Sequence, residues 1–380
     1  MQTVKLKDVI MRVKDKIDKD NTYLEYYVGG EHIDSGELCI TRKGKIEGST
    51  IGPAFHMHFM PGDVLLMSRN PHLKKAGVVD FEGICSDVSY VCRTKDENVL
   101  CQRYLPFIFQ TDHFWDFVEE NKKGGLPFFL NWSDFEKYEF PLPDIEKQRE
   151  LAELLWAAQD TKTAYLDLLR QTDELVKSQF IEMFGTQEKP KCTYVPLKNL
   201  TTVCSGGTPD RKKSEYWANG DIPWVKTTEL QNDIIRRTEE CISEKGLNNS
   251  SAKIVPPETI LIAMYGQGKT RGMTAFLGID ACTNQACACV LPTPKIKMLF
   301  LWYYFICEYN NLRNMAKGSS QANLNAGMIK NYLVPYPSEQ EQTAFEEIVA
   351  QSDKSKFEIK KAIENINTMV KSLVQQNYNN

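Results

Sequence analysis

The chain has 380 residues, of which 42% are hydrophobic and 25% are charged, and its formal net charge is −4. This length and composition exclude a mainly disordered protein and indicate two folded domains, or three at most. No apolar run reaches the ~18 residues of a membrane helix, and the charged start MQTVKLKDVIMRVKDK differs from a signal peptide, so we expect a cytoplasmic protein. Eleven cysteines without a repeated close spacing favour reduced thiols over a disulfide framework.

The negative charge lies in two segments, residues 144–184 and 338–376, and the remainder of the chain is mildly basic. A nucleic-acid partner is therefore compatible with the overall charge, although the charge does not demonstrate one.

The second half of the chain repeats the first. FPLPDIEKQRELAELL, which begins at Phe140, aligns with VPYPSEQEQTAFEEIV, which begins at Val334, and the two share both prolines and one glutamine. The same offset matches Tyr138 with Tyr332, and VKLKDV near the start resembles VPLKNL, which begins at Val195. Self-similarity over this length predicts a tandem duplication.

Within each half the pattern changes from short strands and loops to one long helix. After the repeated prolines, apolar or small residues recur in alternating steps of three and four, which is the spacing of a seam between helices. The predicted seam residues are Leu151, Leu154, Ala158, Tyr165, Leu168, Leu175, Phe345, Ile348, Ile359, Ile363, Ile366, Val370 and Leu373. We expect the two helices to pair with one another; a helical hairpin within each half, or a seam that recruits another subunit, are the alternatives.

The predicted fold is therefore mixed α/β (α+β), with two globular domains, each followed by a long helix, and a pseudo-two-fold internal repeat. The helices are expected to form an antiparallel coiled coil. The predicted segments are 1–143, 144–184, 185–337 and 338–380. GTQEKP, which begins at Gly185, ends the first helix because a glycine followed by a proline is a typical helix stop.

No catalytic or metal site is predicted. AMYGQGKT, from Ala263 to Thr270, fits a relaxed phosphate-loop pattern, but a working loop needs a helix to begin at the lysine. The continuation RGMTAFLG reads as a strand, so a surface hairpin is favoured over a nucleotide-binding enzyme. Cys282, Cys287 and Cys289 have no nearby histidine, and His56 and His58 alternate on a strand without a third ligand.

Basic and aromatic clusters in loops of both halves are the remaining candidates for function. Lysine and arginine neutralise phosphates, while asparagine, glutamine and arginine can read base edges. The candidate DNA-binding residues are Arg42, Lys43, Lys45, Arg69, Asn70, His72, Lys74, Lys75, Thr208, Arg211, Lys212, Lys213, Tyr216, Trp217, Lys226, Tyr265, Gln267, Lys269, Arg271, Ser319 and Gln321.

The chain resembles the DNA-specificity subunits of type I restriction-modification systems over nearly its whole length. The resemblance is carried by GGTPDRKKSEYWANGDIPWVKTTEL from Gly206, TNQACACV from Thr283 and KGSSQANLNAGMIKNYLVPYPSEQEQ from Lys317. In the first half, GLPFFLNWSDFEKYEFPLPDIEKQ from Gly125 and YVGGEHIDSGELCI from Tyr27 are similar to segments of the same family.

The resemblance implies a non-catalytic reader of double-stranded DNA with two target-recognition domains, 1–143 and 185–337, each reading half of a split site. It also implies helices that set the spacing and dock methylation subunits, which restriction subunits then join. S-adenosylmethionine would belong to the methylation partner, and ATP and magnesium to the restriction partner. The first half lacks the Gly-Gly-Thr-Pro opening, which favours an asymmetric site. A reader of a related type II cutting-and-methylating system and a coiled-coil adaptor are the alternatives.

Overall fold

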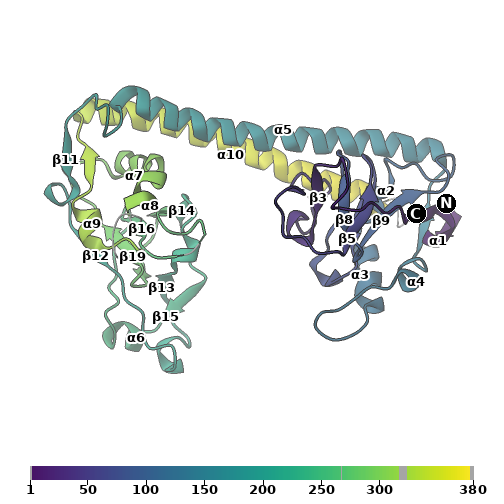
Figure 1. Ribbon diagram of the computed structural model, residues 1–380. Helices are drawn as coiled ribbons and strands as arrows, with labels where there is room; N and C mark the ends of the chain where they lie inside the picture. The colour runs from purple at the N-terminus through teal and green to yellow at the C-terminus, as the bar shows by residue number, and fades with distance from the viewer. Residues whose placement is uncertain (1, 267, 316–322, 377–380) are drawn as a thin grey trace. The chain divides into compact units, whose positions relative to one another are not determined.

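The computed structural model describes residues 2–266, 268–315 and 323–376. They form two compact units (Figure 1). Unit 1 comprises Met1–Leu166 and Lys360–Asn380, and unit 2 comprises Asp167–Ile359. This division cuts both long helices near their middle, so it does not test the predicted segment boundaries, which stay a prediction. Within the described ranges no helix is both long and apolar enough to cross a bilayer.

Unit 1 contains two four-stranded sheets and one two-stranded ribbon. Its strands are β1 (Gln2–Lys5), β2 (Ile10–Val13), β3 (Tyr26–Val28), β4 (Gly44–Lys45), β5 (Phe55–Phe59), β6 (Val64–Met67), β7 (Ala76–Val78), β8 (Gly83–Ser86), β9 (Ser89–Thr94) and β10 (Glu139–Leu142). Its short helices are α1 (Leu6–Val9), α2 (Leu105–Ile108), α3 (Asp112–Asn121) and α4 (Trp132–Phe135). The sheet orders are β2-β9-β6-β7 and β4-β3-β8-β5, and β1 pairs with β10.

Unit 2 contains a five-stranded sheet, a three-stranded sheet and a ribbon. Its strands are β11 (Tyr194–Pro196), β12 (Val203–Ser205), β13 (Ile222–Val225), β14 (Ile234–Ile235), β15 (Glu240–Ile242), β16 (Ile260–Ala263), β17 (Thr274–Leu277), β18 (Cys282–Thr283), β19 (Cys287–Val290) and β20 (Leu333–Pro335). Its short helices are α6 (Glu244–Asn248), α7 (Met298–Cys307), α8 (Tyr309–Met315) and α9 (Ala326–Lys330). The sheet orders are β12-β19-β16-β17-β14 and β15-β13-β18, and β11 pairs with β20.

The two units share one pattern of strand pairing. The order β2-β9-β6-β7 in unit 1 corresponds to β12-β19-β16-β17 in unit 2, and every pair in both series is antiparallel. The pair β3 with β8 and the pair β13 with β18 are both parallel. The ribbons β1–β10 and β11–β20 also correspond. The predicted internal repeat is thus confirmed at the level of topology.

The repeated glutamine explains why the sequence match is strongest at the start of each long helix. Gln148 is fully buried, where it donates to the carbonyl of Pro143 (2.8 Å) and accepts from the backbone N–H of Cys101 (2.9 Å). Gln342 is also buried, where it donates to Pro337 (3.0 Å) and accepts from the N–H of Lys297 (2.9 Å). A buried amide must satisfy both of its polar ends, and glutamine does so at this joint between helix and domain.

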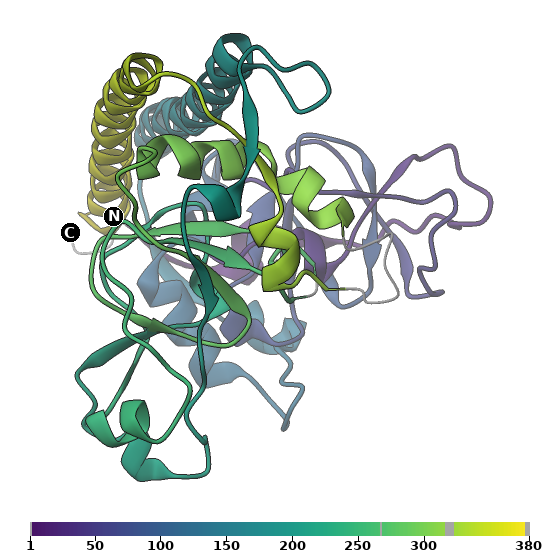
Figure 2. The same cartoon turned by 90° about the vertical axis from the view of Figure 1, so that its left-hand side faces the viewer.

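The long helices are α5 (Ile145–Phe184) and α10 (Glu339–Gln376), and they pair as predicted. Within unit 1, Leu151 and Leu155 of α5 share a hydrophobic cluster with Val374 of α10. Within unit 2, Phe180 of α5 packs edge to face against Phe345 of α10, with ring centroids 5.1 Å apart. Figure 2 shows these unit 2 segments side by side above the green helix α7. The end of α5 meets the start of α10, so the pair is antiparallel.

The start of each long helix and the end of α5 have local signals typical of such positions. The carboxylate of Asp144 accepts from the N–H of Lys147 (2.9 Å), and Ser338 forms a reciprocal cap with Glu341 (2.8 Å from the Ser338 N–H to Oε2). Gly185 follows α5 with φ of 75°, and a Cβ there would lie 2.2 Å from the carbonyl oxygen of Lys189. The predicted glycine stop is therefore confirmed, with a steric reason.

The predicted seam on α5 is wrong at three positions, where the residue that faces inward is the one after the predicted residue. Leu154, Leu168 and Leu175 were expected in the seam but are 47%, 43% and 58% exposed. The inward positions are the next residues along the chain, namely Leu155, Leu169 and Val176. Each error falls on a doublet of apolar residues, where a repeat with an average step of 3.5 fits either member equally well. Packing in the two hydrophobic cores selects the second member in the case of Leu155 and Val176.

The other predicted seam residues are turned at least partly inward. Leu151, Ala158 and Phe345 are buried, and Tyr165, Ile348, Ile359, Ile363, Ile366, Val370 and Leu373 are half-buried. The core of unit 2 extends from the helix pair α5 and α10 through α7 to the five-stranded sheet. Phe180 and Phe184 of α5 pack on Phe300 of α7, at ring-centroid distances of 5.3 and 5.0 Å.

Candidate nucleic-acid interface

In unit 2, three loops meet at one end of the five-stranded sheet. Strands β12 and β16 end there while β19 and β17 begin there, because neighbouring strands are antiparallel. The loops are residues 206–213, 264–273 and 284–286. Backbone bonds join them, from the N–H of Gly207 to Thr283 (2.8 Å) and from the N–H of Met264 to Ala286 (2.8 Å). The structure thereby brings together two of the predicted basic clusters and the TNQACACV segment.

The glycine pair at the start of the first loop is required by close backbone approach. A Cβ at Gly206 would lie 2.0 Å from Oγ1 of Thr283, and one at Gly207 would lie 2.4 Å from the backbone nitrogen of Ala252. The next residue, Thr208, donates its hydroxyl to the side-chain oxygen of Gln285. Gln285 was missed by the sequence reasoning, although it lies in a segment that carries the family resemblance. The Thr208–Gln285 pair presents hydroxyl and amide groups of the kind that read base edges.

The loop that contains Lys269 is a hairpin and not a phosphate loop. Strands β16 and β17 flank it, so the chain continues from Lys269 into a strand instead of a helix. The predicted surface hairpin is thus confirmed, and the geometry for holding a nucleotide phosphate at a helix N-terminus does not exist there. Tyr265, Gly268 and Lys269 are exposed and Arg271 is half-buried. Gln267, Ser319 and Gln321, also predicted to bind DNA, lie outside the described residues.

Helix α8 holds the backbone of this hairpin. The guanidinium of Arg313 donates to the backbone carbonyls of Arg271 (2.8 Å) and Gly268 (2.7 Å). The hydroxyl of Tyr309 donates to the backbone carbonyl of Lys269 (2.7 Å). These bonds fix the main chain while the Lys269 side chain stays exposed. Arg313 and Tyr309 were missed because their partners are about 40 residues away in sequence, where no local pattern connects them.

Two of the predicted DNA-binding cations have acidic partners within unit 2. Arg211 stacks over Trp217 (3.7 Å to the ring centroid) and pairs with Glu240. Lys226 pairs with Glu239 (2.6 Å) and Glu240 (3.0 Å). These two cations hold the pKa of the Glu240 carboxyl below its usual range, and Arg211 has a larger effect than Lys226. These contacts stabilise the base of the loop and reduce the charge that Arg211 and Lys226 offer to a phosphate.

The remaining predicted residues of the 206–217 loop divide between surface and core. Lys212 and Lys213 are exposed, and Lys213 bonds the hydroxyl of Tyr216 (3.1 Å). Tyr216 is buried, with 6% of its surface exposed, and Trp217 is half-buried. We therefore assign Tyr216 and Trp217 to the packing of the loop rather than to a ligand surface.

In unit 1 the loop after β6 corresponds to the hairpin after β16. It contains Arg69, Asn70, His72, Lys74 and Lys75. The N–H of Asn70 donates to Phe128 (2.8 Å), and the carbonyl of Lys74 accepts from Gly36 (3.1 Å), so the loop lies between two other loops. Arg69, His72 and Lys74 are exposed, while Lys75 donates to the carbonyl of Gly30.

The other predicted cluster of unit 1 is divided. Arg42 is exposed and pairs with Asp34, in the segment that adjoins the β6 loop. Lys43 lies over the rings of Tyr26 (4.0 Å) and Phe81 (4.3 Å). Lys45 is exposed on the edge strand β4 of the second sheet. The structure does not place Lys43 and Lys45 with the loop after β6.

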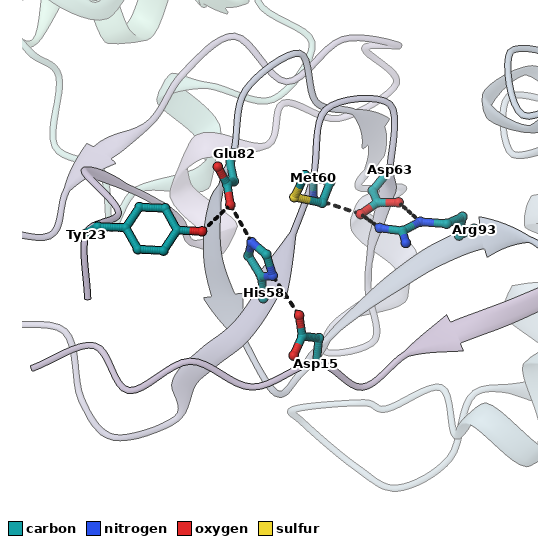
Figure 3. Close-up of polar contacts among 7 residues, drawn as sticks. All are labelled: Asp15, Tyr23, His58, Met60, Asp63, Glu82 and Arg93. Atoms are coloured by element: carbon teal, nitrogen blue, oxygen red, sulfur yellow. Dashed lines mark hydrogen bonds and ion pairs between the residues drawn. The ribbon is translucent and has the colours of Figure 1, made fainter. Parts of the chain in front are cut away.

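Unit 1 also contains a charged cluster that the sequence reasoning missed (Figure 3). His58 on β5, only 9% exposed, lies between two carboxylates, with Nδ1 2.8 Å from Asp15 and Nε2 2.8 Å from Glu82. Tyr23 donates to the same oxygen of Glu82 (2.9 Å). Beside it, Arg93 makes two 2.7 Å bonds to buried Asp63. An imidazole that faces an acceptor at each nitrogen is held as imidazolium.

The His58 cluster makes the stability of unit 1 depend on pH. Burial lowers the pKa of His58, but the hydrogen bonds to Asp15 and Glu82 outweigh it, and the net pKa is raised. A histidine whose pKa is higher in the folded chain stabilises the fold while it is protonated. This stabilisation is complete below the pKa of the unfolded chain, about 6.5, and it is lost as the pH rises through the pKa of the folded chain. We expect His58→Gln to destabilise the chain more at about pH 6 than at about pH 9, as measured by urea unfolding.

The matched control for that experiment is His56→Gln, on the same strand. His56 lies 3.0 Å from the carbonyl oxygen of Pro53, and within the described residues no carboxylate pairs with it. Equal destabilisation by His58→Gln at both pH values would contradict the charged state assigned to His58. Among the described residues, no group of three or more His, Cys, Asp or Glu side chains could hold a metal ion.

Comparison with known proteins gives one consistent result. Residues 191–368 match the family model described as type I restriction modification DNA specificity domain. The chain is 26% identical over 285 residues to the EcoR124I/EcoR124II specificity subunit of Escherichia coli, which covers 72% of this chain and 68% of that protein. It is 31% identical over 164 residues to the MjaIX specificity subunit of Methanocaldococcus jannaschii, which covers 41% and 37% of the two chains.

The fold agrees with solved structures. A chain from a study of complex assembly and conformational transition of the type I R-M system aligns with a TM-score of 0.60 at 18% identity, over 99% of this chain and 97% of that one. The type I restriction-modification S subunit from M. genitalium aligns with a TM-score of 0.56 at 13% identity, over 99% and 96%. These likenesses concern the fold, with its β-rich domains and paired long helices.

Proposed function

We propose that the chain is a non-catalytic DNA-specificity subunit of a type I restriction-modification system, and that each of its units reads one half of a bipartite, asymmetric DNA site. In unit 2 the reading surface is formed by the loops 206–213, 264–273 and 284–286. In unit 1 it is formed by the loop 68–75 and its neighbours.

The observation that carries this proposal is the equivalence of the two basic loops. Residues 68–75 follow β6 and residues 264–273 follow β16, and these strands hold the same place in the two sheets. Each loop presents exposed cations, namely Arg69 and Lys74 in one and Lys269 in the other. Their other residues differ, which supports different sequence preferences for the two units and hence an asymmetric site.

The first test concerns the hairpin of unit 2. We expect Lys269→Ala with Arg271→Ala to weaken binding of the assembled complex to its cognate DNA by roughly tenfold and to reduce the salt dependence by about one phosphate contact per cation lost. The measurement is a binding isotherm at several salt concentrations.

The matched control is Lys295→Ala. Lys295 is an exposed lysine in the same unit, beyond the opposite end of β19, where it donates to the carbonyl of Asn199 (2.9 Å). The substitution removes one positive charge without touching the proposed surface. Unchanged affinity and salt slope in the double variant would remove this hairpin from the interface.

We further propose that the outer face of α5 docks the methylation subunits. Leu168 and Leu175 are exposed and lie seven residues apart, so they share one face of the helix. Restriction subunits would join the complex through the methylation core. S-adenosylmethionine would be bound by the methylation subunits, and ATP with magnesium by the restriction subunits, since the GKT segment of this chain lacks the helix that a phosphate loop needs.

A further inference from the structure

Two cysteines face each other across neighbouring strands of unit 2. Cys204 on β12 and Cys289 on β19 are direct register partners. The pairs two residues away on either side are hydrogen-bonded. The N–H of Leu291 donates to the carbonyl of Thr202 (3.0 Å), and the N–H of Gly206 donates to the carbonyl of Cys287 (3.4 Å). Because hydrogen-bonded pairs alternate along an antiparallel ladder, Cys204 and Cys289 also form such a pair, with Cα atoms about 5.5 Å apart. That separation lies within the range that a disulfide bridges.

The two thiols have different surroundings. Cys204 is half-buried on the edge strand of the sheet, whereas Cys289 is 1% exposed and its Sγ lies 3.4 Å from Oγ1 of Thr283. The hydrogen bond with Cys289 is the main cause that lowers the pKa of Cys204 to about 6; burial opposes it, and the positive charges of Lys253 and Lys330 add to it. The pKa of Cys289 is raised by that same hydrogen bond and by burial.

Two other cysteines of unit 2 lie in its hydrophobic cores. Cys282 and Cys287 are fully buried, and burial raises the pKa of each, to about 11 for Cys282. A thiol in that state is a poor nucleophile at neutral pH, because the reactive species is the thiolate.

We propose that Cys204 and Cys289 form a redox-active pair that is oxidised to a disulfide by hydrogen peroxide. The Cys204 thiolate attacks one peroxide oxygen, the O–O bond breaks, and the products are a Cys204 sulfenic acid and, after protonation, water. The Cys289 thiol then attacks the sulfenic sulfur, its proton leaves with the hydroxyl as a second water, and the S–S bond forms. The two sulfurs lose two electrons, which reduce the peroxide.

The pair lies at the base of the first loop of the proposed DNA surface. Cys204 is two residues before Gly206, and Thr283, the neighbour of Cys289, accepts from the N–H of Gly207 at 2.8 Å. Oxidation would therefore tie the strand from which that loop departs. The proposal rests on the strand register, burial and ionisation of the two thiols, and it holds whether or not the loop binds DNA.

The experiment uses the full chain, treated with hydrogen peroxide, alkylated and mapped by peptide mass spectrometry. We expect a peptide pair linked through Cys204 and Cys289 that a dithiol reductant restores to free thiols. In Cys289→Ser we expect the link to disappear and a dione probe to trap sulfenic acid at Cys204. Cys287→Ser, a buried neighbour, should keep the link.

One measurement needs no variant. In the native chain, iodoacetamide at neutral pH should alkylate Cys204 roughly tenfold faster than the other cysteines. The proposal would be overturned if Cys204 were alkylated no faster than the other cysteines. It would also be overturned if Cys204 were oxidised straight to sulfonic acid, or became linked to a cysteine other than Cys289.

Discussion

Insertion of four residues into each long helix, after Leu166 in α5 and after Ile359 in α10, is expected to lengthen the preferred spacer between the two DNA half-sites by one or two base pairs. Four residues add about 6 Å to a helix and rotate its downstream part by about 40°. One base pair adds about 3.4 Å and rotates the groove by a similar angle. Affinity for the original spacer should fall by roughly 100-fold, because only one half-site can then be engaged in register.

This result is expected if the helices set the spacing of the proposed reading surfaces. The chosen points lie where unit 1 and unit 2 divide each helix, so the packing of Leu155 in one and Phe180 in the other is left in place. The measurement is a binding series over DNA with increasing spacers. The same four residues placed after Asn249, in an exposed turn, should leave the preference unchanged. An unaltered preference in the helix variant would exclude the spacing role.

Replacement of Leu168 and Leu175 by alanine is expected to weaken assembly with the methylation subunits by about 100-fold, with little loss of stability in the free chain. The two residues are 43% and 58% exposed, and fully burying a leucine against a partner is worth roughly 1.5–3 kcal/mol. Part of that free energy is lost for each substitution. Analytical ultracentrifugation or calorimetry with purified methylation subunits measures the change.

Ile254→Ala provides the control, because Ile254 is an exposed aliphatic residue of the same unit, 49% exposed, that lies outside both long helices. The control variant should assemble as the unaltered chain does. Normal assembly of the double leucine variant would show that the methylation subunits use another face.

Sequence reasoning predicted the candidate site in part. The loops that meet at the end of the five-stranded sheet include two clusters chosen for their charge, and their binding to DNA stays a prediction. Charge alone could not show that Glu240 neutralises Arg211 and Lys226, nor that Arg313 holds the Lys269 hairpin. Those partners lie roughly 15 to 45 residues away in sequence, and their pairing depends on strand order.

By itself the sequence determined the duplication, the two long helices and the glycine stop that ends the first of them. These features are local: a glycine stop and a repeated apolar spacing act within a few residues of one another. Tertiary structure alone decided which member of each apolar doublet on α5 faces inward, which loops meet, and that Cys204 lies opposite Cys289. Each of these depends on contacts between segments distant in the chain, where packing and strand register, rather than local preference, select one of several arrangements that the sequence pattern fits equally well.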